Sequence, residues 1–236
     1  MIDGQPCICF QNAGYKNRLE VVRIDIKYGP FEEWQRDGLI KIINDTWNVD
    51  RFGYPPEVGL KYSASDLEAC LSIATFTEVA ILDGQPVGYI FGRCEDAFDD
   101  DALRKAKRTD RQIKRKLRFS RYGRAMLGFK KLYMQSDDKL LEDTGKEYGG
   151  ELVFFAISPE ARGKGVGKRL FSDLLAYMKQ NGVREFYVFT DTTCDHSFYD
   201  HNGFVQRGAL PQTAKFRKNE EMTFFIYDYT LSENDA

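Results

Sequence analysis

Residues 151–168 read ELVFFAISPEARGKGVGK, an apolar run that ends at a proline and leads into a glycine-rich segment. The near-continuous apolar run 151–157 is typical of a strand that is buried on both faces. Residues 162–180 continue with a glycine-rich start and then apolar residues at helical spacing, which predict a helix. A second apolar run, 186–189, predicts another buried strand. Strand, helix and strand in this order predict two parallel strands joined by a right-handed crossover.

The segment between the first strand and the helix predicts an anion site. Gly163, Gly165 and Gly167 let the backbone turn tightly and approach a ligand. The exposed N–H groups and the dipole at a helix start attract negative charge, so a phosphate group is the natural occupant. The segment is not a Walker P-loop, because Lys168 is followed by Arg169 and the required spacing is absent. It also lacks the G-x-G-x-x-G pattern of dinucleotide-binding folds.

Two motifs nevertheless resemble those of one family. Arg162, Gly165 and Gly167 meet the pattern Arg/Gln-x-x-Gly-x-Gly/Ala, which resembles the coenzyme A pyrophosphate loop of the GNAT superfamily of N-acetyltransferases. About thirty-five residues later, residues 198–204 read FYDHNGF and resemble the second signature of that family, F-Y-x-x-x-G-F. The chain departs from the family pattern at Thr192, where many members carry asparagine.

The resemblance implies an α/β (α+β) fold with a mixed central sheet flanked by helices. Two central parallel strands should splay apart in that sheet, so that the pantetheine arm of acetyl-CoA can pass between them. We expect a single domain over residues 1–236, with a basic helical insertion at about 96–146 that is no part of the minimal fold. The element order of the family extends from about residue 19 to 230, and the motif-level match from 151 to 204.

The same resemblance implies which residues contact acetyl-CoA as the cosubstrate. The end of the first buried strand should bind pantetheine through its backbone, and one of its N–H groups should bind the oxyanion. The loop amides should hold the pyrophosphate, with nearby positive side chains adding charge, although a solvated surface is the alternative for the two lysines. The expected cofactor-binding residues are Phe155, Ala156, Ile157, Arg162, Gly163, Lys164, Gly165, Val166, Gly167, Lys168 and Thr192.

Acetyl transfer to an amine requires a proton acceptor and a proton donor. Tyr199 matches the tyrosine that points at the thioester sulfur in many family members, and it is the predicted general acid. Glu151 opens the cofactor strand and is the first candidate for the general base. Glu78 and Asp191 are the next candidates, and His196 is a candidate proton shuttle, because histidine titrates near neutral pH.

The rest of the chain predicts further strands and helices around this unit. The pair Asp83-Gly84 is a strong signal for a hairpin turn between two apolar runs. Ser63 or Ser65 is the predicted N-cap of the second helix. The predicted elements are strand 19–26, helix 31–47, loop 53–56, helix 65–72, strands 76–82 and 87–94, one or two surface helices in 96–145, a short helix that begins at or includes 198–199 and ends at 202–203, and strands 204–207 and 222–230.

The composition is that of a folded protein, with 42% hydrophobic residues and a net charge of -2. This charge does not indicate a nucleic-acid or membrane partner for the whole chain. Thirteen lysines and arginines between 104 and 131 are either a solvated face or a footprint for a phosphate-bearing partner. No run of eighteen apolar residues and no signal sequence is evident, so we expect a cytoplasmic protein. No metal is expected, because Cys7-Ile8-Cys9 has no second cysteine pair and no neighbouring histidine.

The sequence and the resemblance together predict an acetyl-CoA-dependent N-acetyltransferase that works by direct attack in a ternary complex. Its acceptor is a small-molecule or peptide amine, and a polyamine, an amino acid, an antibiotic and a protein lysine all stay open. A homodimer is compatible with the resemblance. The alternative is a non-catalytic acyl-CoA-binding or regulatory module, because no general base is obvious from the sequence.

Overall fold

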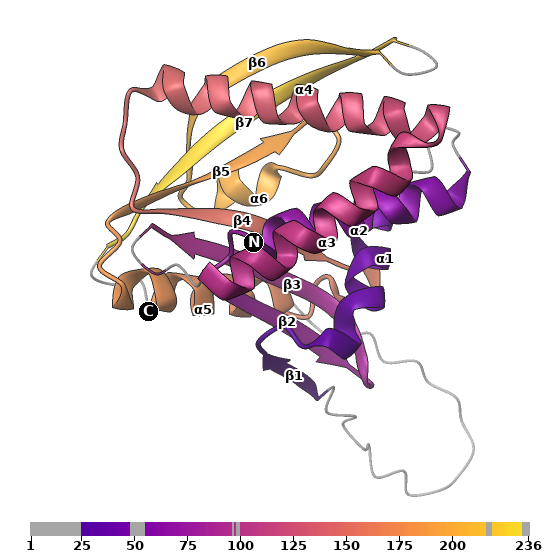
Figure 1. Ribbon diagram of the computed structural model, residues 1–236. Coiled ribbons are helices and arrows are strands. Elements are labelled where there is room, and N and C mark those ends of the chain that lie inside the picture. Colours follow the sequence, from indigo (N-terminus) through magenta and orange to yellow (C-terminus); the bar gives the residue numbers. More distant parts are fainter. Residues whose placement is uncertain (1–24, 48–54, 96, 98–99, 216–218, 233–236) are drawn as a thin grey trace, which may run out of the picture.

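The computed structural model describes residues 25–47, 55–95, 97, 100–215 and 219–232, with a seven-stranded sheet at its centre (Figure 1). The strands are β1 (Ile26–Gly29), β2 (Phe76–Leu82), β3 (Gln85–Cys94), β4 (Gly150–Ile157), β5 (Glu185–Asp191), β6 (Val205–Lys215) and β7 (Asn219–Thr230). Their order in the sheet is β1-β2-β3-β4-β5-β7-β6. β4 and β5 are parallel, whereas the other neighbours are antiparallel. This mixed sheet confirms the predicted fold class.

The parallel pair β4 and β5 diverges soon after it begins. In the described sheet, only Gly150 and Glu151 of β4 pair with β5, opposite Phe186 and Tyr187. A bulge then interrupts the pairing of β4 with β3, because Phe154 and Leu152 have partners on β3 and the residue between them has none. Bulges bend a strand and increase its twist. The predicted splayed pair is therefore present, and it opens a gap in the middle of the sheet.

Helices cover both faces of the sheet. They are α1 (Arg36–Thr46) after the short η1 (Glu33–Gln35), α2 (Pro56–Leu71), α3 (Asp100–Arg118), α4 (Arg121–Thr144), η3 (Pro159–Ala161), α5 (Val166–Gln180) and α6 (Ser197–His201). α5 and α6 pack on one face, and α1, α2 and α4 on the other, while α3 packs on α2 (Figure 1). Within the described ranges, none of the helices has the length and apolar character that crossing a membrane requires.

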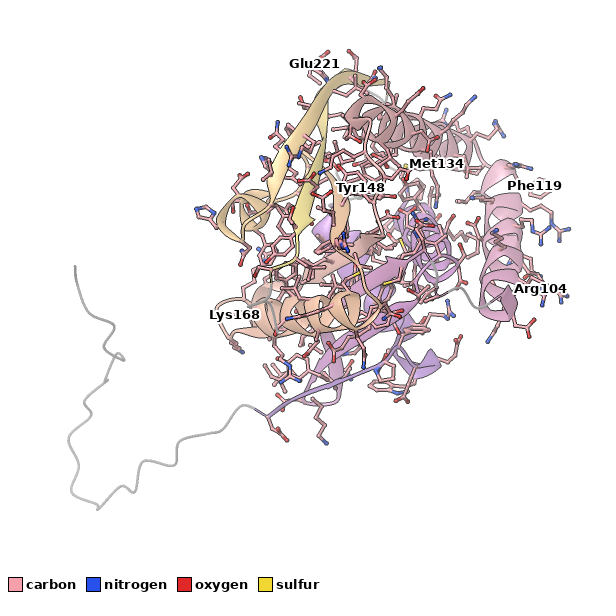
Figure 2. All side chains as sticks on the ribbon, turned by 90° about the vertical axis from the view of Figure 1, so that its left-hand side faces the viewer. Arg104, Phe119, Met134, Tyr148, Lys168 and Glu221 are labelled. Atoms are coloured by element: carbon pink, nitrogen blue, oxygen red, sulfur yellow. The ribbon has the colours of Figure 1, made fainter. Side chains whose placement is uncertain are left out.

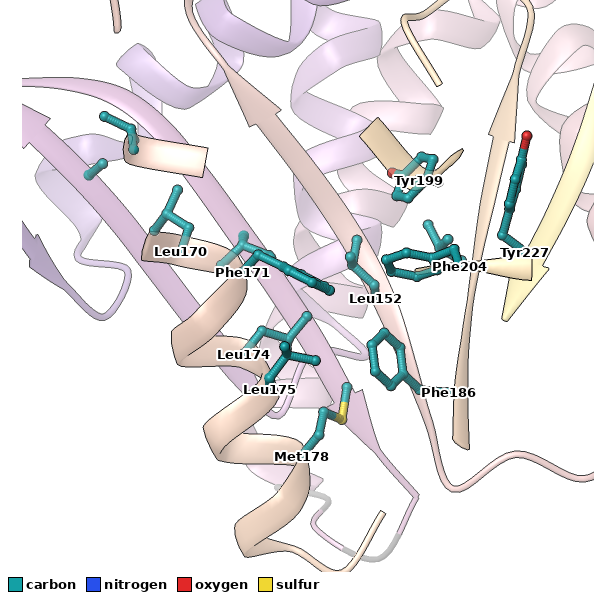
Figure 3. Close-up of a cluster of buried hydrophobic side chains, with 14 of the residues drawn as sticks. Leu152, Leu170, Phe171, Leu174, Leu175, Met178, Phe186, Tyr199, Phe204 and Tyr227 are labelled. Atoms are coloured by element: carbon teal, nitrogen blue, oxygen red, sulfur yellow. The ribbon is translucent and has the colours of Figure 1, made fainter. Parts of the chain in front are cut away.

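The largest part of the core lies between α5 and the sheet. Leu170, Leu174 and Met178 recur at helical spacing and are fully buried. They belong to one cluster with Leu152 of β4 and Phe186 of β5 (Figure 3). This packing fixes α5 against both strands of the parallel pair, and thereby places the glycine-rich loop at the end of β4.

The structure corrects the predicted start of the second helix. α2 begins at Pro56, with Pro55 as its N-cap, and continues through Ser63 and Ser65. Proline suits the first helical position, because the N–H that it lacks would have no partner there. Ser65 instead donates a hydrogen bond to Asp110 of α3 at 2.7 Å. The N-cap prediction for the two serines was therefore wrong.

The two ends of the sheet also differ from the sequence prediction. β1 runs to Gly29, beyond the predicted end at Ile26. β6 extends to Lys215, whereas only 204–207 was predicted. Pro211 is tolerated within β6 because β6 is an edge strand and proline has no N–H to donate. Residues 1–24, with the cysteine pair and most of the first predicted strand, and residues 53 and 54 of the predicted loop lie outside the described residues.

The hairpin of β2 and β3 is present as predicted, with positive φ angles at Asp83 and Gly84. The insertion forms two helices, which are joined at Phe119 and Ser120. Phe119 is 85% exposed, and Figure 2 shows it with Arg104 at the edge of the molecule. α4 is not a purely surface helix, because it buries Met126 and contacts β6 and β7. Within the insertion, α3 is thus largely solvated, whereas α4 packs against the sheet.

Candidate active site

A cavity of about 520 Å³ lies where β4 and β5 diverge. Its lining includes all of β4 from Glu151 to Ile157, and Val188 to Asp191 of β5. Side chains of α1, α2, α4 and α6 complete the wall. The volume is in the range of small-molecule sites. The gap in the sheet therefore leads into a site that both helical layers enclose.

Tyr199, the predicted acid, lines this cavity from α6. Its side chain is buried, and burial raises the pKa of the Tyr199 phenol above its ordinary value, with smaller contributions from Cys194 and Tyr227. The ring contacts Phe204 at 5.1 Å and Tyr227 at 5.6 Å between centroids. The phenol therefore stays protonated over the physiological pH range, as a proton donor must.

Glu151, the first candidate base, lines the same cavity from the start of β4. Burial raises the pKa of Glu151, and the guanidinium of Arg93 opposes this effect. Arg93 Nη2 lies 3.1 Å from Glu151 Oε2, and the hydroxyl of Tyr187 donates to the same oxygen at 3.3 Å. A carboxyl whose pKa is raised toward neutrality is a better proton acceptor than an exposed one.

The glycine-rich loop has the backbone shape of an anion cradle. Gly163 and Gly165 have φ angles of 72° and 78°, which side chains other than glycine rarely adopt. α5 begins directly afterwards at Val166, so its first N–H groups have no partners within the helix. Lys164 and Lys168 are exposed, and Figure 2 shows Lys168 at the edge of the molecule. These residues fit a pyrophosphate group.

The structure brings seven of the predicted site residues to the cavity wall. They are Glu151, Phe155, Ala156, Ile157, Arg162, Gly167 and Tyr199. Six others are not part of that wall: Gly163, Lys164, Gly165, Val166, Lys168 and Thr192. Five of these six belong to the loop and the helix start, next to the cavity. Thr192 is different, because its Oγ1 accepts a hydrogen bond from the Thr223 amide at 3.2 Å. Its contact with the cofactor stays a prediction.

The other candidate bases lie in different places. Glu78 is not a lining residue, because it lies on β2 beside Asp173 of α5, on the opposite face of the sheet from α2 and α4. Burial, with Asp173, raises the pKa of Glu78 to about 7, so this group is perturbed without adjoining the cavity. Asp191 does line the cavity, and it accepts hydrogen bonds from the Tyr133 hydroxyl and from the Thr193 amide.

His196, the candidate shuttle, is not a lining residue either. It is the N-cap residue of α6, and its ring packs against Phe225 at 5.1 Å between centroids. Glu151 is therefore the predicted base that the structure places with Tyr199, and Asp191 is its alternative.

Several polar residues of the wall were not singled out from the sequence as site residues, among them one from α2 and three from α4. Asp66 comes from α2, and Lys130, Tyr133 and Asp137 come from α4. The three α4 residues recur at spacings of three and four, which places them on one helix face. That face carries both charged and aromatic side chains, and this mixture is the signal that could have identified it in the sequence. The many basic residues of the insertion made this helix face hard to recognise in the sequence.

Comparison with known proteins identifies a family. The model of the "Acetyltransferase (GNAT) family" matches residues 37–204. A curated mycothiol acetyltransferase from Geodermatophilus obscurus is 35% identical over 69 residues, which cover 28% of this chain and 22% of that protein. The chain thus matches about a fifth of the length of this relative.

Solved structures share the fold. A protein from Streptococcus mutans UA159 has a TM-score of 0.52 and 16% identity, and the match covers 87% of this chain and 99% of that one. An aminoglycoside 6'-acetyltransferase type Ii has a TM-score of 0.50 and 16% identity, with 86% and 96% covered. At this identity the likeness concerns the fold alone.

Proposed function

Because the chain belongs to the GNAT family of acetyltransferases, we propose that it transfers the acetyl group of acetyl-CoA to an amine. The observation that carries this proposal is the meeting of Glu151 and Tyr199 at one cavity in the gap between β4 and β5. Glu151 lies at the start of β4, whereas Tyr199 lies on α6, which follows β5 in the chain. A proton acceptor and a proton donor at one cavity are what direct acyl transfer to an amine requires.

Acetyl-CoA would bind along β4 and the glycine-rich loop, and it supplies the activated acetyl group. The amides of Gly163 to Lys168 and the side chains of Arg162 and Lys164 would hold its pyrophosphate. The backbone of Phe155 to Ile157 would bind the pantetheine arm, because β5 does not pair with this part of β4. Arg162 is oriented by a hydrogen bond from its Nε to the Ile157 carbonyl at 3.3 Å.

The chain's own groups would move two protons. Glu151 accepts a proton from the amine nitrogen, directly or through a water molecule, as the nitrogen forms its bond to the acetyl carbon. A backbone N–H of β4 stabilises the negative charge on the acetyl oxygen. Tyr199 donates its proton to the sulfur as the carbon–sulfur bond breaks. No covalent bond between the acetyl group and the protein is required.

The first test is calorimetric titration with acetyl-CoA, with ATP and NAD as controls. We expect acetyl-CoA alone of the three to bind, and we then expect thiol release in a screen of amines. The titration comes first because a failed turnover screen cannot separate a wrong family activity from a wrong amine. Absence of acetyl-CoA binding would refute the roles given to Arg162, Gly165 and Tyr199.

A non-catalytic acyl-CoA-binding module is the second candidate. It is favoured by the ion pair between Glu151 and Arg93, which engages the carboxylate that catalysis would need. Acetyl-CoA binding without thiol release across a wide amine panel supports this candidate. Turnover of any amine eliminates it.

A further inference from the structure

Most of the carboxyls around the cavity have an ion-pair or hydrogen-bond partner among the described residues. Lys130 Nζ lies 2.6 Å from Asp66 Oδ1, so these two side chains neutralise each other. Glu151 has Arg93 as its cation at 3.1 Å. Asp191 has no cation in this set but accepts two hydrogen bonds, from Tyr133 and from the Thr193 amide.

Asp137 of α4 is the exception. Its carboxyl lines the cavity but has no hydrogen bond or ion pair with any residue in the part of the chain that the structure describes. The charged groups that act on it are Glu151 of β4, Asp191 of β5 and Asp138 of its own helix, and all three are acidic. Burial, followed by these three groups, raises the pKa of Asp137 to about 8. The site therefore lacks one positive charge beside Asp137.

The remaining wall on this side is apolar and aromatic. Trp47 stacks on Phe154 of β4 with 4.8 Å between ring centroids. Phe129 and Tyr133 of α4 make an edge-to-face contact, also at 4.8 Å. Together with Met134, these side chains line the cavity. A bound molecule in contact with them needs an apolar body, because charged or strongly polar groups would lose hydration there without gaining a partner.

We propose that the acceptor is a small primary amine with a single positive charge and an apolar body, and that Asp137 receives its ammonium group on binding. This inference rests on the proposed acetyl transfer, and it names the class of amine and the residue that selects it. The amine enters as a cation beside Asp137 and loses one proton to the solvent before it reacts, and Glu151 accepts the next proton as the nitrogen forms its bond to the acetyl carbon. Asp137 is thus a binding and specificity-determining residue contributed by the insertion.

Two other amine classes fit this site less well. An amino acid carries a carboxylate next to its amine, and that group would face Glu151, Asp191 and Asp137, which are all acidic. A diamine or polyamine carries a second ammonium, which would lie against the aromatic wall, because Asp66 and Glu151 already have cations. Among the cavity carboxyls that the structure describes, Asp137 alone has neither a hydrogen bond nor an ion pair, so a singly charged amine complements it.

Binding should be linked to a proton. Near neutral pH the Asp137 carboxyl is largely protonated in the free protein, because its pKa is raised to about 8. An ammonium beside it favours the ionised form, so the complex releases the carboxyl proton to the solvent. The Lys130–Asp66 pair and the Tyr133 hydroxyl also adjoin the cavity, and both stay unchanged in this step. The number of protons released when the amine binds therefore depends on Asp137.

The test is calorimetric titration of the full chain at pH 7 with three matched probes. 2-Phenylethylamine has one ammonium and an apolar body, L-phenylalanine adds a carboxylate, and 1,4-diaminobutane replaces the ring with a second ammonium. Each titration is run with coenzyme A present, which carries no acetyl group to transfer, and in two buffers of different ionisation enthalpy. We expect 2-phenylethylamine to bind at least about tenfold more tightly than the other two. Its binding should release a proton.

Asp137→Asn should weaken the binding of 2-phenylethylamine by about tenfold or more and abolish the proton release. Asp138→Asn, on the exposed side of the same helix, is the matched control and should change the affinity by less than about twofold. The proton release of the unmodified protein is itself a test, since it needs no variant to fold. Equal or tighter binding of L-phenylalanine or 1,4-diaminobutane would overturn the inference, as would an unchanged affinity in Asp137→Asn.

The experiment separates this inference from the proposed function. Acetyl-CoA binding and thiol release with any of the amines support acetyl transfer, whichever amine is preferred. Binding of 2-phenylethylamine with proton release, but without any acetyl-CoA binding, upholds the amine site and refutes acetyl transfer.

Discussion

The guanidinium of Arg93 lies 3.1 Å from the carboxylate of Glu151, and the two residues face each other in the register of β3 and β4. The same Arg93 nitrogen also contacts Glu95 at 2.9 Å and the Tyr187 hydroxyl at 3.0 Å. Burial acts to raise the pKa of Glu151, and Arg93 limits the rise. The pair therefore sets the pH at which the predicted base can accept a proton.

Removing the guanidinium should move the pH profile of the reaction. In Arg93→Gln the pKa of Glu151 loses its main lowering influence and rises further. The acid limb of kcat/KM should then move to higher pH by about one unit. The profile is measured by thiol release between pH 5 and about 9. An unmoved acid limb would show that a group other than Glu151 controls it.

Replacing the base itself should lower the rate without weakening cofactor binding. Glu151→Gln keeps the size of the side chain but cannot accept a proton, so kcat should fall about 10²-fold or more. The KM for acetyl-CoA should stay within about twofold, because the proposed cofactor contacts come from the other end of β4 and the loop. Glu78→Gln is the control, since Glu78 lies outside the cavity wall. A similar loss in both variants would remove Glu151 from its role.

Tyr199→Phe tests the predicted acid. Loss of the hydroxyl should lower kcat by about 10² to 10³-fold, because the departing thiolate loses its proton donor. Tyr227→Phe is a matched control, because its ring contacts Tyr199 at 5.6 Å while its hydroxyl donates to Gln206 at 3.2 Å and lies outside the cavity wall. The control should keep nearly full activity. Full rate and an unchanged pH profile in Tyr199→Phe would contradict the assignment.

Two glycines with the same backbone strain but different surroundings test the loop. Gly165 and Gly145 both have positive φ angles, 78° and 60°, and a Cβ atom at either would meet nothing within 4 Å. Alanine at either position should therefore destabilise the fold by about 1 kcal/mol. Gly165→Ala alone should raise the KM for acetyl-CoA, by about tenfold, because it distorts the anion cradle. If both variants raise KM equally, the loop has no special part in cofactor binding.

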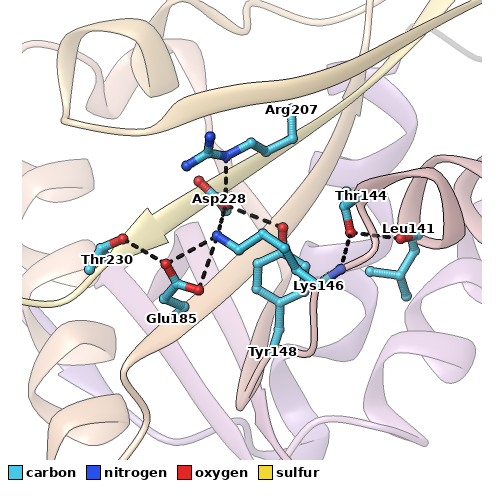
Figure 4. Close-up of polar contacts among 8 residues, drawn as sticks. All are labelled: Leu141, Thr144, Lys146, Tyr148, Glu185, Arg207, Asp228 and Thr230. Carbon is cyan, nitrogen blue, oxygen red and sulfur yellow. Dashed lines mark hydrogen bonds and ion pairs between the residues drawn. The ribbon is translucent and has the colours of Figure 1, made fainter.

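A network around Asp228 should stabilise the fold in a pH-dependent way. Asp228 is 1% exposed and accepts contacts from Lys146 at 2.7 Å, Arg207 at 2.8 Å and the Tyr148 hydroxyl at 3.2 Å (Figure 4). Burial acts to raise the pKa of Asp228, but the hydrogen bonds from Arg207 and Lys146 outweigh it and lower the pKa below its ordinary value. Asp228→Asn should lower the free energy of unfolding by about 2 kcal/mol.

The pH dependence of this stabilisation follows from the lowered pKa. The contribution is fully present above the ordinary aspartate pKa of about 4, and it is lost as the pH falls through the lower folded value. Urea unfolding at neutral pH and at acid pH measures the difference between the two proteins. Asp143→Asn is the control, because its pair with Lys139 is exposed and should contribute little to stability. An equal difference at both pH values would exclude ionised Asp228 as the cause.

Most of the fold around the proposed cofactor site could be predicted from local signals. The apolar run of β4, the glycines at 163 and 165 and the helical spacing of α5 follow one another in the chain, and each reports its own backbone conformation. The hairpin at Asp83 and Gly84 is local in the same sense. Where a signal was local but ambiguous, as at the serines of α2, the prediction placed the helix start too late.

The sequence by itself therefore determined the strand-loop-helix-strand unit, the family resemblance and the nomination of Glu151 and Tyr199. Only the tertiary structure decided which carboxyls share the cavity, because pairing between distant segments depends on packing and not on neighbours in the chain. Glu78 has the perturbed pKa of a candidate base but faces α5, whereas Asp137 came from an insertion that reads as a solvated basic helix. The early divergence of β4 and β5 makes these side chains meet, and it depends on the whole sheet and its helices.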